Sequence, residues 1–265
     1  MKSAISKFTD SMRDDWDIRA RKNAFYYIAS WREDWNEASF FQSGEDDYEK
    51  FVSGILKRHA IPANSTVAEV GCGAGRMTRS FARRFKRVAA IDVSSEMLKR
   101  AKTLHRGIDN ITWILGNGVD LTGIPNDSVD FAFSYLVLQH FPTADLVSAY
   151  IGEMLRVLKP GGICLFQFNG TSDKNMNWKG RAAWSLMDSL RELRLHRASR
   201  SVAKLLGFDP EMAGKTWHGT DVRSAQVVDA VERNGGMVLE LLETETPMAW
   251  CCARKSPSSE KDRGA

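Results

Sequence analysis

The strongest constraint on the fold is a regular alternation of short apolar segments with helical segments between residues 64 and 168. We predict strands at residues 66–70, 88–92, 111–115, 129–135 and 163–168, separated by helices at about 76–85, 94–104 and 144–158. Strand–helix–strand units of this kind form right-handed crossovers and therefore a parallel sheet. A helix at about 221–233 and a terminal hairpin, 237–243 and 248–253, complete an α/β fold.

The segments around this core divide the chain into zones. Residues 1–60 place many aromatic side chains among charged ones, at spacings typical of short amphipathic helices. They form either a helical layer packed on the core or an aromatic lid over a ligand. The main domain covers residues 61–255 and is interrupted by an insertion at about 169–220. Residues 256–265 are polar and charged, which indicates a disordered tail.

Composition narrows the class of protein. Hydrophobic residues make up 43% and charged residues 26% of the 265 positions, which suffices for a packed core, and the net charge of +4 does not indicate nucleic-acid binding. No apolar run reaches the roughly 18 residues of a membrane span, and the N-terminus lacks the apolar region of a signal peptide. None of the four cysteines has metal-ligand spacing. We therefore expect a cytoplasmic protein with no membrane partner and no metal.

A glycine turn, Gly71, Gly73 and Gly75, connects the first predicted strand to the helix after it. Glycine allows positive φ and lets a ligand approach the backbone, while the helix start points free N–H groups at it. Such glycines can also serve only to turn a strand into a helix. Asp92, however, ends the second predicted strand, where a carboxylate can accept hydrogen bonds from ribose hydroxyls. The glycine turn and Asp92 together predict a nucleoside-containing cofactor bound beyond the carboxyl ends of the strands.

The glycine spacing discriminates between cofactors. Nicotinamide enzymes carry G-x-G-x-x-G, in which the last glycine packs the helix on the strand. This chain has G-x-G-x-G, with Glu69 before it and Arg76 after it. An NAD(P)-dependent oxidoreductase therefore remains an alternative that the spacing disfavours.

Residues 69–75 resemble motif I (E/D-x-G-x-G-x-G) of the class I S-adenosylmethionine-dependent methyltransferases. Residues 90–98, 115–121, 128–141 and 155–162 resemble the later motifs of that family, in the same order and at its spacing. The resemblance covers residues 64–168 and implies a Rossmann-like sheet of seven strands, mostly parallel, with the last strand antiparallel and helices on both faces. The N-terminal helical layer and an inserted helical cap would be added to that core.

The resemblance also implies a set of cofactor-binding residues. Asp92 would bind the ribose, Val93 and Met97 would pack on the adenine, and Asn117 would meet the adenine amino group through its side-chain oxygen. Glu69 would hold the glycine loop or the amino group of the cofactor. The full implied set is Glu69, Gly71, Cys72, Gly73, Gly75, Asp92, Val93, Met97, Asn117, Gly118, Val119, Leu136, Gln139 and Tyr27.

S-adenosylmethionine carries a methyl group on a sulfonium, so the protein mainly has to align a nucleophile about 3 Å from that carbon. Aromatic faces can hold the cation, and the candidates are Trp16, Tyr26, Tyr27 and Tyr135. A base is required only if the acceptor loses a proton. His140, after the fourth strand, is the candidate catalytic residue, with a packing role as the alternative. We expect the substrate to contact Tyr26, Trp217 and His218.

The insertion is rich in positive charge. Arg191, Arg194, Arg197, Arg200 and Lys204 recur at steps of three and four, which places them along one side of a helix. This side is either a solvated surface or part of a cap that favours an anionic acceptor, and nucleic acid is disfavoured. The sequence thus predicts an S-adenosylmethionine-dependent methyltransferase acting on a small molecule. A protein that binds S-adenosylmethionine without turnover remains the other alternative.

Overall fold

The computed structural model describes residues 2–170, 185–187, 189–190, 193, 195–212 and 215–257. Within these residues the centre is a sheet of seven strands in the order β3-β2-β1-β4-β5-β7-β6. The strands are β1 (Thr66–Val70), β2 (Arg87–Asp92), β3 (Ile111–Leu115), β4 (Val129–Ser134), β5 (Leu158–Phe168), β6 (Gly236–Leu242) and β7 (Ala249–Lys255). β7 runs antiparallel to both β5 and β6, whereas β1 to β5 pair in parallel. The predicted Rossmann-like sheet is confirmed.

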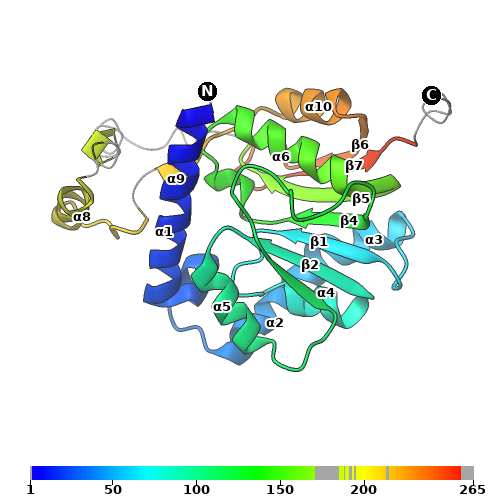
Figure 1. Ribbon diagram of the computed structural model, residues 1–265, viewed down its shortest axis with the longest axis horizontal. Helices are drawn as coiled ribbons and strands as arrows, with labels where there is room; N and C mark the ends of the chain where they lie inside the picture. The colour runs from blue at the N-terminus through cyan, green and yellow to red at the C-terminus, as the bar shows by residue number, and fades with distance from the viewer. Residues whose placement is uncertain are drawn as a thin grey trace.

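Helices cover both faces of the sheet (Figure 1). On one face, α6 (Ala144–Val157) and α10 (Ser224–Arg233) pack against Ala68 and Ala132. On the other, α3 (Gly54–Arg58), α4 (Thr78–Arg84) and α5 (Ser95–Leu104) pack against Val67 and Phe131. Successive strand residues point to opposite faces, so each strand supplies both cores and reads as a continuous apolar run.

The strand order reverses between β1 and β4, which are neighbours in the sheet but not in the sequence. The crossovers through α4 and α5 lead away from β1 in one direction, and the chain then returns to place β4 on the other side of β1. The carboxyl ends of β1 and β4 therefore diverge into loops that leave a crevice between them. In open α/β sheets this reversal point is where ligands bind.

The N-terminal region forms α1 (Lys2–Ile28), α2 (Glu37–Asp47) and the π-helical turn η1 (Tyr48–Ser53) before α3. α1 is longer than the short helices expected and is kinked at Asn23, whose side chain accepts a hydrogen bond from Tyr26 N at 3.2 Å. It lies beside α5 (Figure 1). Asp17 on α1 accepts from Glu96 N at 3.1 Å and from Ser94 Oγ at 2.5 Å. α1 thereby caps the exposed N–H groups at the start of α5, which fixes it to the core.

The structure differs from the predicted boundaries at β5. The strand begins at Leu158 rather than residue 163, because Leu158 already pairs with Val129. The residues between Leu158 and Ile163 bulge out of the pairing, with Gly161 at φ +81°. The glycines that were expected to precede the strand therefore form a bulge within it.

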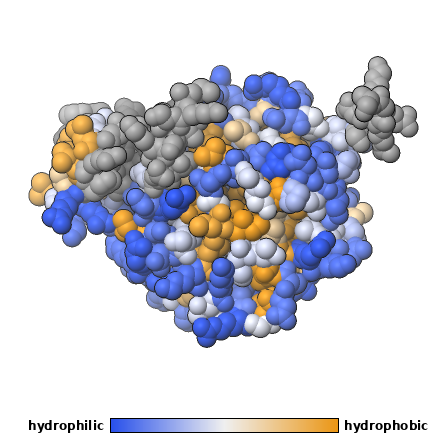
Figure 2. All heavy atoms as spheres, viewed as in Figure 1, coloured by the Kyte–Doolittle hydropathy of each residue, from blue (hydrophilic) through white to orange (hydrophobic). Residues whose placement is uncertain are grey.

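Only part of the insertion is described, including α8 (His196–Leu205) and α9 (Lys215–His218). α8 lies on the far side of α1 from the sheet (Figure 1). Its Arg197 and Lys204 are exposed, and Arg200 forms an ion pair with Glu211 at 2.9 Å. Leu205 is 86% exposed, and apolar surface is visible at this edge of the molecule in Figure 2. Several basic residues of the predicted cap lie outside the described residues: Lys174, Lys179, Arg181, Arg191 and Arg194.

Residues 258–265 of the predicted tail also lie outside the described residues. Among the helices that are described, none combines the length and apolarity needed to cross a bilayer. The four cysteines are free thiols. Within the described ranges, His, Cys, Asp and Glu side chains form no group of three that could hold a metal ion.

Candidate active site

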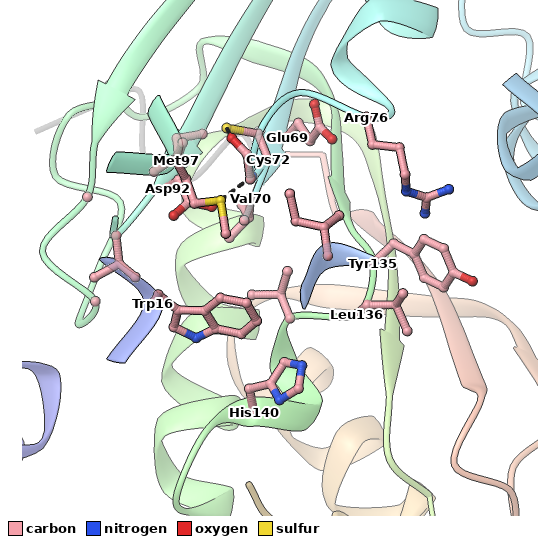
Figure 3. A pocket seen from close by; sticks show the side chains of 18 of the residues that line it. Trp16, Glu69, Val70, Cys72, Arg76, Asp92, Met97, Tyr135, Leu136 and His140 are labelled. Carbon is pink, nitrogen blue, oxygen red and sulfur yellow. Dashed lines mark hydrogen bonds between the residues drawn. The ribbon is translucent and has the colours of Figure 1, made fainter. Parts of the chain in front are cut away.

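A cavity opens at the carboxyl ends of β1 to β4 and is walled on one side by α1 (Figure 3). Its empty volume, counted out to open solvent, is about 980 Å³. The predicted residues that line it are Glu69, Gly71, Cys72, Gly73, Asp92, Val93, Met97, Gly118, Leu136, Tyr27 and the candidate catalytic residue His140.

The glycine turn forms the floor of the cavity. Gly71 has φ +74°, and a Cβ there would lie only 2.1 Å from Cγ2 of Val137. The N–H groups of Gly71 and Cys72 donate to the carbonyl of Ile91 at 2.8 and 2.9 Å, so the turn is tied to the end of β2. Both the dihedral angle and the close approach of the β4 loop require glycine at position 71.

Asp92 stands at the end of β2, at the edge of the turn. Its two carboxylate oxygens accept hydrogen bonds from Gly73 N and Ser94 N, each at 2.8 Å. Burial raises the pKa of Asp92 to about 6. Since each carboxylate oxygen can accept two hydrogen bonds, the side chain is held in place and still has acceptor capacity facing the cavity. This arrangement fits a pair of vicinal hydroxyls, as on a ribose.

Glu69 is buried beneath the same turn. It accepts a hydrogen bond from Thr78 Oγ1 at 2.5 Å, and burial raises its pKa to about 8. The carboxyl group is therefore mostly protonated at neutral pH. A cationic group entering the cavity would favour its ionisation, and buried carboxyls of this kind concentrate at functional sites.

His140 lies on the 3-10 turn η2 (Leu138–His140) at the opposite wall from the glycine turn (Figure 3). Its Nδ1 is 2.5 Å from the carbonyl oxygen of Trp217, so Nδ1 carries the proton and Nε2 is the acceptor nitrogen, which lies 3.4 Å from the amide nitrogen of Gln139. Burial, assisted by the charge of Arg19, lowers the pKa of His140 to about 4. The ring is thus neutral at physiological pH and is a hydrogen-bond acceptor of low basicity.

The loop after β4 contains a backbone conformation that is rare for leucine. Leu136 has φ +59°, and its N–H donates to Gln167 Oε1 at 3.2 Å. Gln167 in turn donates to Gln139 Oε1 at 3.1 Å, so Gln139 lies behind the wall and does not line the cavity. Left-handed backbone at a non-glycine residue is costly and recurs where a side chain must be presented to a ligand.

Three other predicted cofactor residues lie outside the cavity: Gly75, Asn117 and Val119. Gly75 packs on His105, where an added Cβ would lie 2.3 Å from Cε1 of the ring. The side-chain oxygen of Asn117 accepts from Val119 N at 2.7 Å, and its amide nitrogen donates to Asp120 at 2.8 Å. Asn117 therefore closes its own turn, at the edge of a second and smaller cavity.

The residues expected to contact substrate lie behind the cavity wall. Tyr26 Oη lies 4.0 Å from Sδ of Met212, and His218 Nε2 lies 2.9 Å from the carbonyl oxygen of Met212. The Trp217 ring lies 5.2 Å from the ring of His140. None of Tyr26, Trp217 and His218 is among the lining residues. They support the wall through His140 and α1.

A buried polar cluster joins α1 to the end of the insertion, and we call Asp15, Arg19, Glu211 and Thr216 the α1–α9 clasp. Arg19 is 1% exposed and donates to the Glu211 carbonyl at 2.8 Å and to Thr216 Oγ1 at 3.0 Å. Thr216 Oγ1 donates to Asp15 at 2.6 Å. The Arg19 guanidinium also stacks on Trp16 at 4.7 Å. Nearby, Tyr27 Oη donates to Asp209 at 2.8 Å, so the clasp region holds α1 over the cavity.

Some lining residues were missing from the predicted set. Trp16 and Tyr135 had been singled out only as aromatic candidates, and both line the cavity. Arg76, Val137 and Tyr150 were not assigned a place in it. The position of Arg76 directly after the glycine turn was the available signal.

The geometry can be compared with known proteins. Residues 68–166 match a family model described as a methyltransferase domain. A demethylmenaquinone methyltransferase of Tropheryma whipplei is 35% identical over 113 residues, covering 42% of this chain and 45% of that protein. A malonyl-[acyl-carrier protein] O-methyltransferase of Salmonella typhimurium is 30% identical over 163 residues, covering 57% and 59%. The chain thus spans about half the length of these curated relatives.

Among solved structures, magnesium protoporphyrin IX methyltransferase from Synechocystis PCC 6803 with bound SAM is similar over 94% of this chain and 97% of its own. The TM-score is 0.58 and the sequence identity 15%. At this identity the likeness concerns the fold alone.

Proposed function

We propose that this chain transfers a methyl group from S-adenosylmethionine to a small-molecule acceptor, because residues 68–166 match a family model described as a methyltransferase domain. The observation that carries the proposal is the buried carboxylate of Asp92, held by Gly73 N and Ser94 N at the edge of the cavity. A position that only turned strand into helix would not need a buried acid there.

The donor side of the cavity lies around Asp92 and Met97. Asp92 would bind the ribose hydroxyls, and the apolar side chains of Met97 and Val93 would pack on the adenine. Glu69, mostly protonated in the free protein, would ionise beside the ammonium group of the cofactor. When bound, S-adenosylmethionine supplies the electrophile, a methyl group on a sulfonium. The chain itself supplies position and the exclusion of water.

The acceptor side is largely apolar. Trp16, Ile28, Leu136, Val137 and Phe141 line it, and α1 separates it from solvent. We propose that α1 acts as the lid and that His140 Nε2 exchanges its long contact with the Gln139 amide, 3.4 Å, for a hydrogen bond from the attacking group. With a pKa of about 4, His140 would orient that group by a hydrogen bond and is too weak a base to take up the proton of a neutral phenol or enol.

The proposed acceptor is a small, largely apolar molecule that can carry an acidic group. Support for an anionic acceptor comes from the positive charge of the insertion in the sequence, although the described basic residues of α8 do not line the cavity. The two relatives support a small-molecule acceptor only broadly, because their names differ in substrate: one is a demethylmenaquinone methyltransferase and the other a malonyl-[acyl-carrier protein] O-methyltransferase. Free, buried cysteines support a reducing compartment and thus a cytoplasmic location.

Calorimetric titration with S-adenosylhomocysteine tests the donor site. We expect binding to the wild type and its loss in Asp92→Ala. Asp130→Asn, which removes a charge paired with Lys159 at 2.7 Å outside the cavity, should bind normally. Absence of wild-type binding, or binding of NADH in its place, would refute the proposal. Turnover is then followed as S-adenosylhomocysteine release across a panel of phenols, enols and carboxylic acids. Binding without turnover on any acceptor would favour a non-catalytic protein.

A further inference from the structure

We propose that Arg76 and Tyr135 form a carboxylate-binding subsite at the β4 end of the cavity, an inference that rests on the proposed function. Arg76 directly follows the glycine turn, and Tyr135 directly follows β4. Both line the cavity, and in Figure 3 they lie together on the side away from Asp92 and Met97.

The guanidinium of Arg76 is fixed by its surroundings. The side chain is 4% exposed, and its Nη1 donates to Asp47 at 2.6 Å and to the Ser43 carbonyl at 3.1 Å. The Tyr135 ring lies 5.6 Å from the guanidinium carbon. α2 approaches so closely that a Cβ on Gly44 would lie 2.1 Å from the Arg76 carbonyl oxygen. The side chain therefore has little freedom to rearrange.

The hydrogen bonds of this arginine are unevenly distributed. All those made to described residues come from Nη1, while Nε and Nη2 make none in the described part of the chain. Neither atom is among the fully buried polar atoms without a partner. The Tyr135 hydroxyl likewise has no hydrogen bond to a described residue and is not fully buried. Together they leave guanidinium and hydroxyl donors accessible at one end of the cavity, a combination that suits a carboxylate.

Charge and distance indicate which carboxylates can reach these donors. Asp47 already balances Arg76, so recognition would depend on hydrogen-bond geometry more than on excess charge. Asp92 ends β2 and Tyr135 follows β4, and these two strands flank β1 on opposite sides. At the usual spacing between neighbouring strands, their ends lie roughly 10 Å apart. A methionyl chain attached to an adenosine at Asp92 can span that distance. The carboxylate can belong to the donor or to the acceptor.

The first experimental arm addresses the donor. The affinity of S-adenosylhomocysteine is compared by calorimetry with that of its decarboxylated analogue, which differs only in that group. The wild type should prefer S-adenosylhomocysteine by roughly 10- to 100-fold, as expected for charge-assisted hydrogen bonds. Arg76→Met should lose this preference. Tyr135→Phe, which removes only the hydroxyl and should fold normally, should reduce it by roughly 3- to 10-fold.

The matched control is Arg84→Met. Arg84 also joins α4 to the N-terminal helices, through Glu45 and Glu49, but does not line the cavity. It should retain the full preference although it loses a comparable ion pair. If Arg76→Met fails to fold, Tyr135→Phe and Arg76→Lys, which should retain part of the preference, still decide the result.

The second arm addresses the acceptor, with benzoate titrated into protein saturated with S-adenosylhomocysteine. Benzoate binding that requires Arg76 and Tyr135, with donor discrimination unchanged in the variants, assigns the subsite to the acceptor. If neither donor discrimination nor benzoate binding depends on these residues, the subsite is refuted. If the wild type binds neither S-adenosylhomocysteine nor its analogue, it is the proposed function that fails.

Discussion

Replacing Glu69 with glutamine should stabilise the free protein in alkaline solution and leave it nearly unchanged in acid. Burial raises the pKa of Glu69 from an unfolded value of 4.5 to about 8. Because the folded pKa is the higher one, the folded state retains a proton that the unfolded chain has released. Stability is therefore complete below about pH 4.5 and is lost as the pH rises toward 8.

The size of the effect follows from that window. Each pH unit in which the unfolded carboxyl is ionised and the folded one is not lowers the unfolding free energy by about 1.4 kcal/mol. Between pH 5 and pH 8 this amounts to roughly 3 kcal/mol. Glutamine cannot ionise, retains an oxygen to accept the bond from Thr78, and should abolish this part of the pH dependence.

Urea denaturation of wild type and Glu69→Gln at pH 5 and pH 8 measures the difference. Glu153→Gln provides a control of opposite sign, since the hydrogen bond from Arg156 lowers the pKa of Glu153. That variant should lose the same stability at pH 5 and pH 8, and less in a third measurement below pH 4.5, where the wild-type carboxyl takes up its proton. A Glu69→Gln variant that is no more stabilised at pH 8 than at pH 5 would show that the carboxyl is not held protonated.

Three further expectations concern the lid, the wall and the floor of the cavity. Two-dimensional NMR should give His140 a titration midpoint near pH 4, and a midpoint near 6.5 would mean that the ring is hydrated. Arg19→Met should lower the unfolding free energy by about 3 kcal/mol or more, because it breaks a buried hydrogen-bond network. The control variant Arg21→Met, at a half-exposed arginine, should lower it by less than about 1 kcal/mol. Equal losses in the two variants would contradict the burial of Arg19. Gly71→Ala should abolish S-adenosylhomocysteine binding, because the added Cβ clashes with Val137. Gly107→Ala, at a glycine with φ +85° in open space, should bind S-adenosylhomocysteine normally. Normal binding by both variants would contradict the packing of the glycine turn.

The central strands were predictable because they are buried on both faces. Four of the five residues in 66–70 are buried, and the predicted and observed strands coincide there. They also coincide at 111–115, an edge strand that is only partly buried but has apolar residues at four of five positions. α1 was harder to predict as one helix, because Asp15 and Arg19 resemble surface residues by type but are buried in the clasp. Which charged side chains become buried depends on partners nearly two hundred residues away. Local spacing does not contain that information.

The same distinction applies to the site. Gly71 and Asp92 reach the cavity because their positions follow from where strands end, which the backbone pattern determines. Asn117 follows a strand in the same way, but its amide is used by its own turn. Trp217 and His218 lie at the end of the insertion, and periodicity does not determine where that end packs on the core. Backbone-determined positions were therefore placed more reliably than those that depend on the choice of a side-chain partner.

The α1–α9 clasp has a consequence for the order in which the molecule is assembled. Arg19 and Thr216 are separated by 197 positions, so α1 leaves the ribosome long before its partner has been made. Until then, Arg19 can only be hydrated, and the sheet can form through the nearer pairings of β1 to β5. The first helix to be synthesised would thus be among the last to be seated. A nascent chain that stops before residue 211 would have the parallel strands β1 to β5 but neither β6 nor β7, and its cavity would lack the clasp that holds α1 over it.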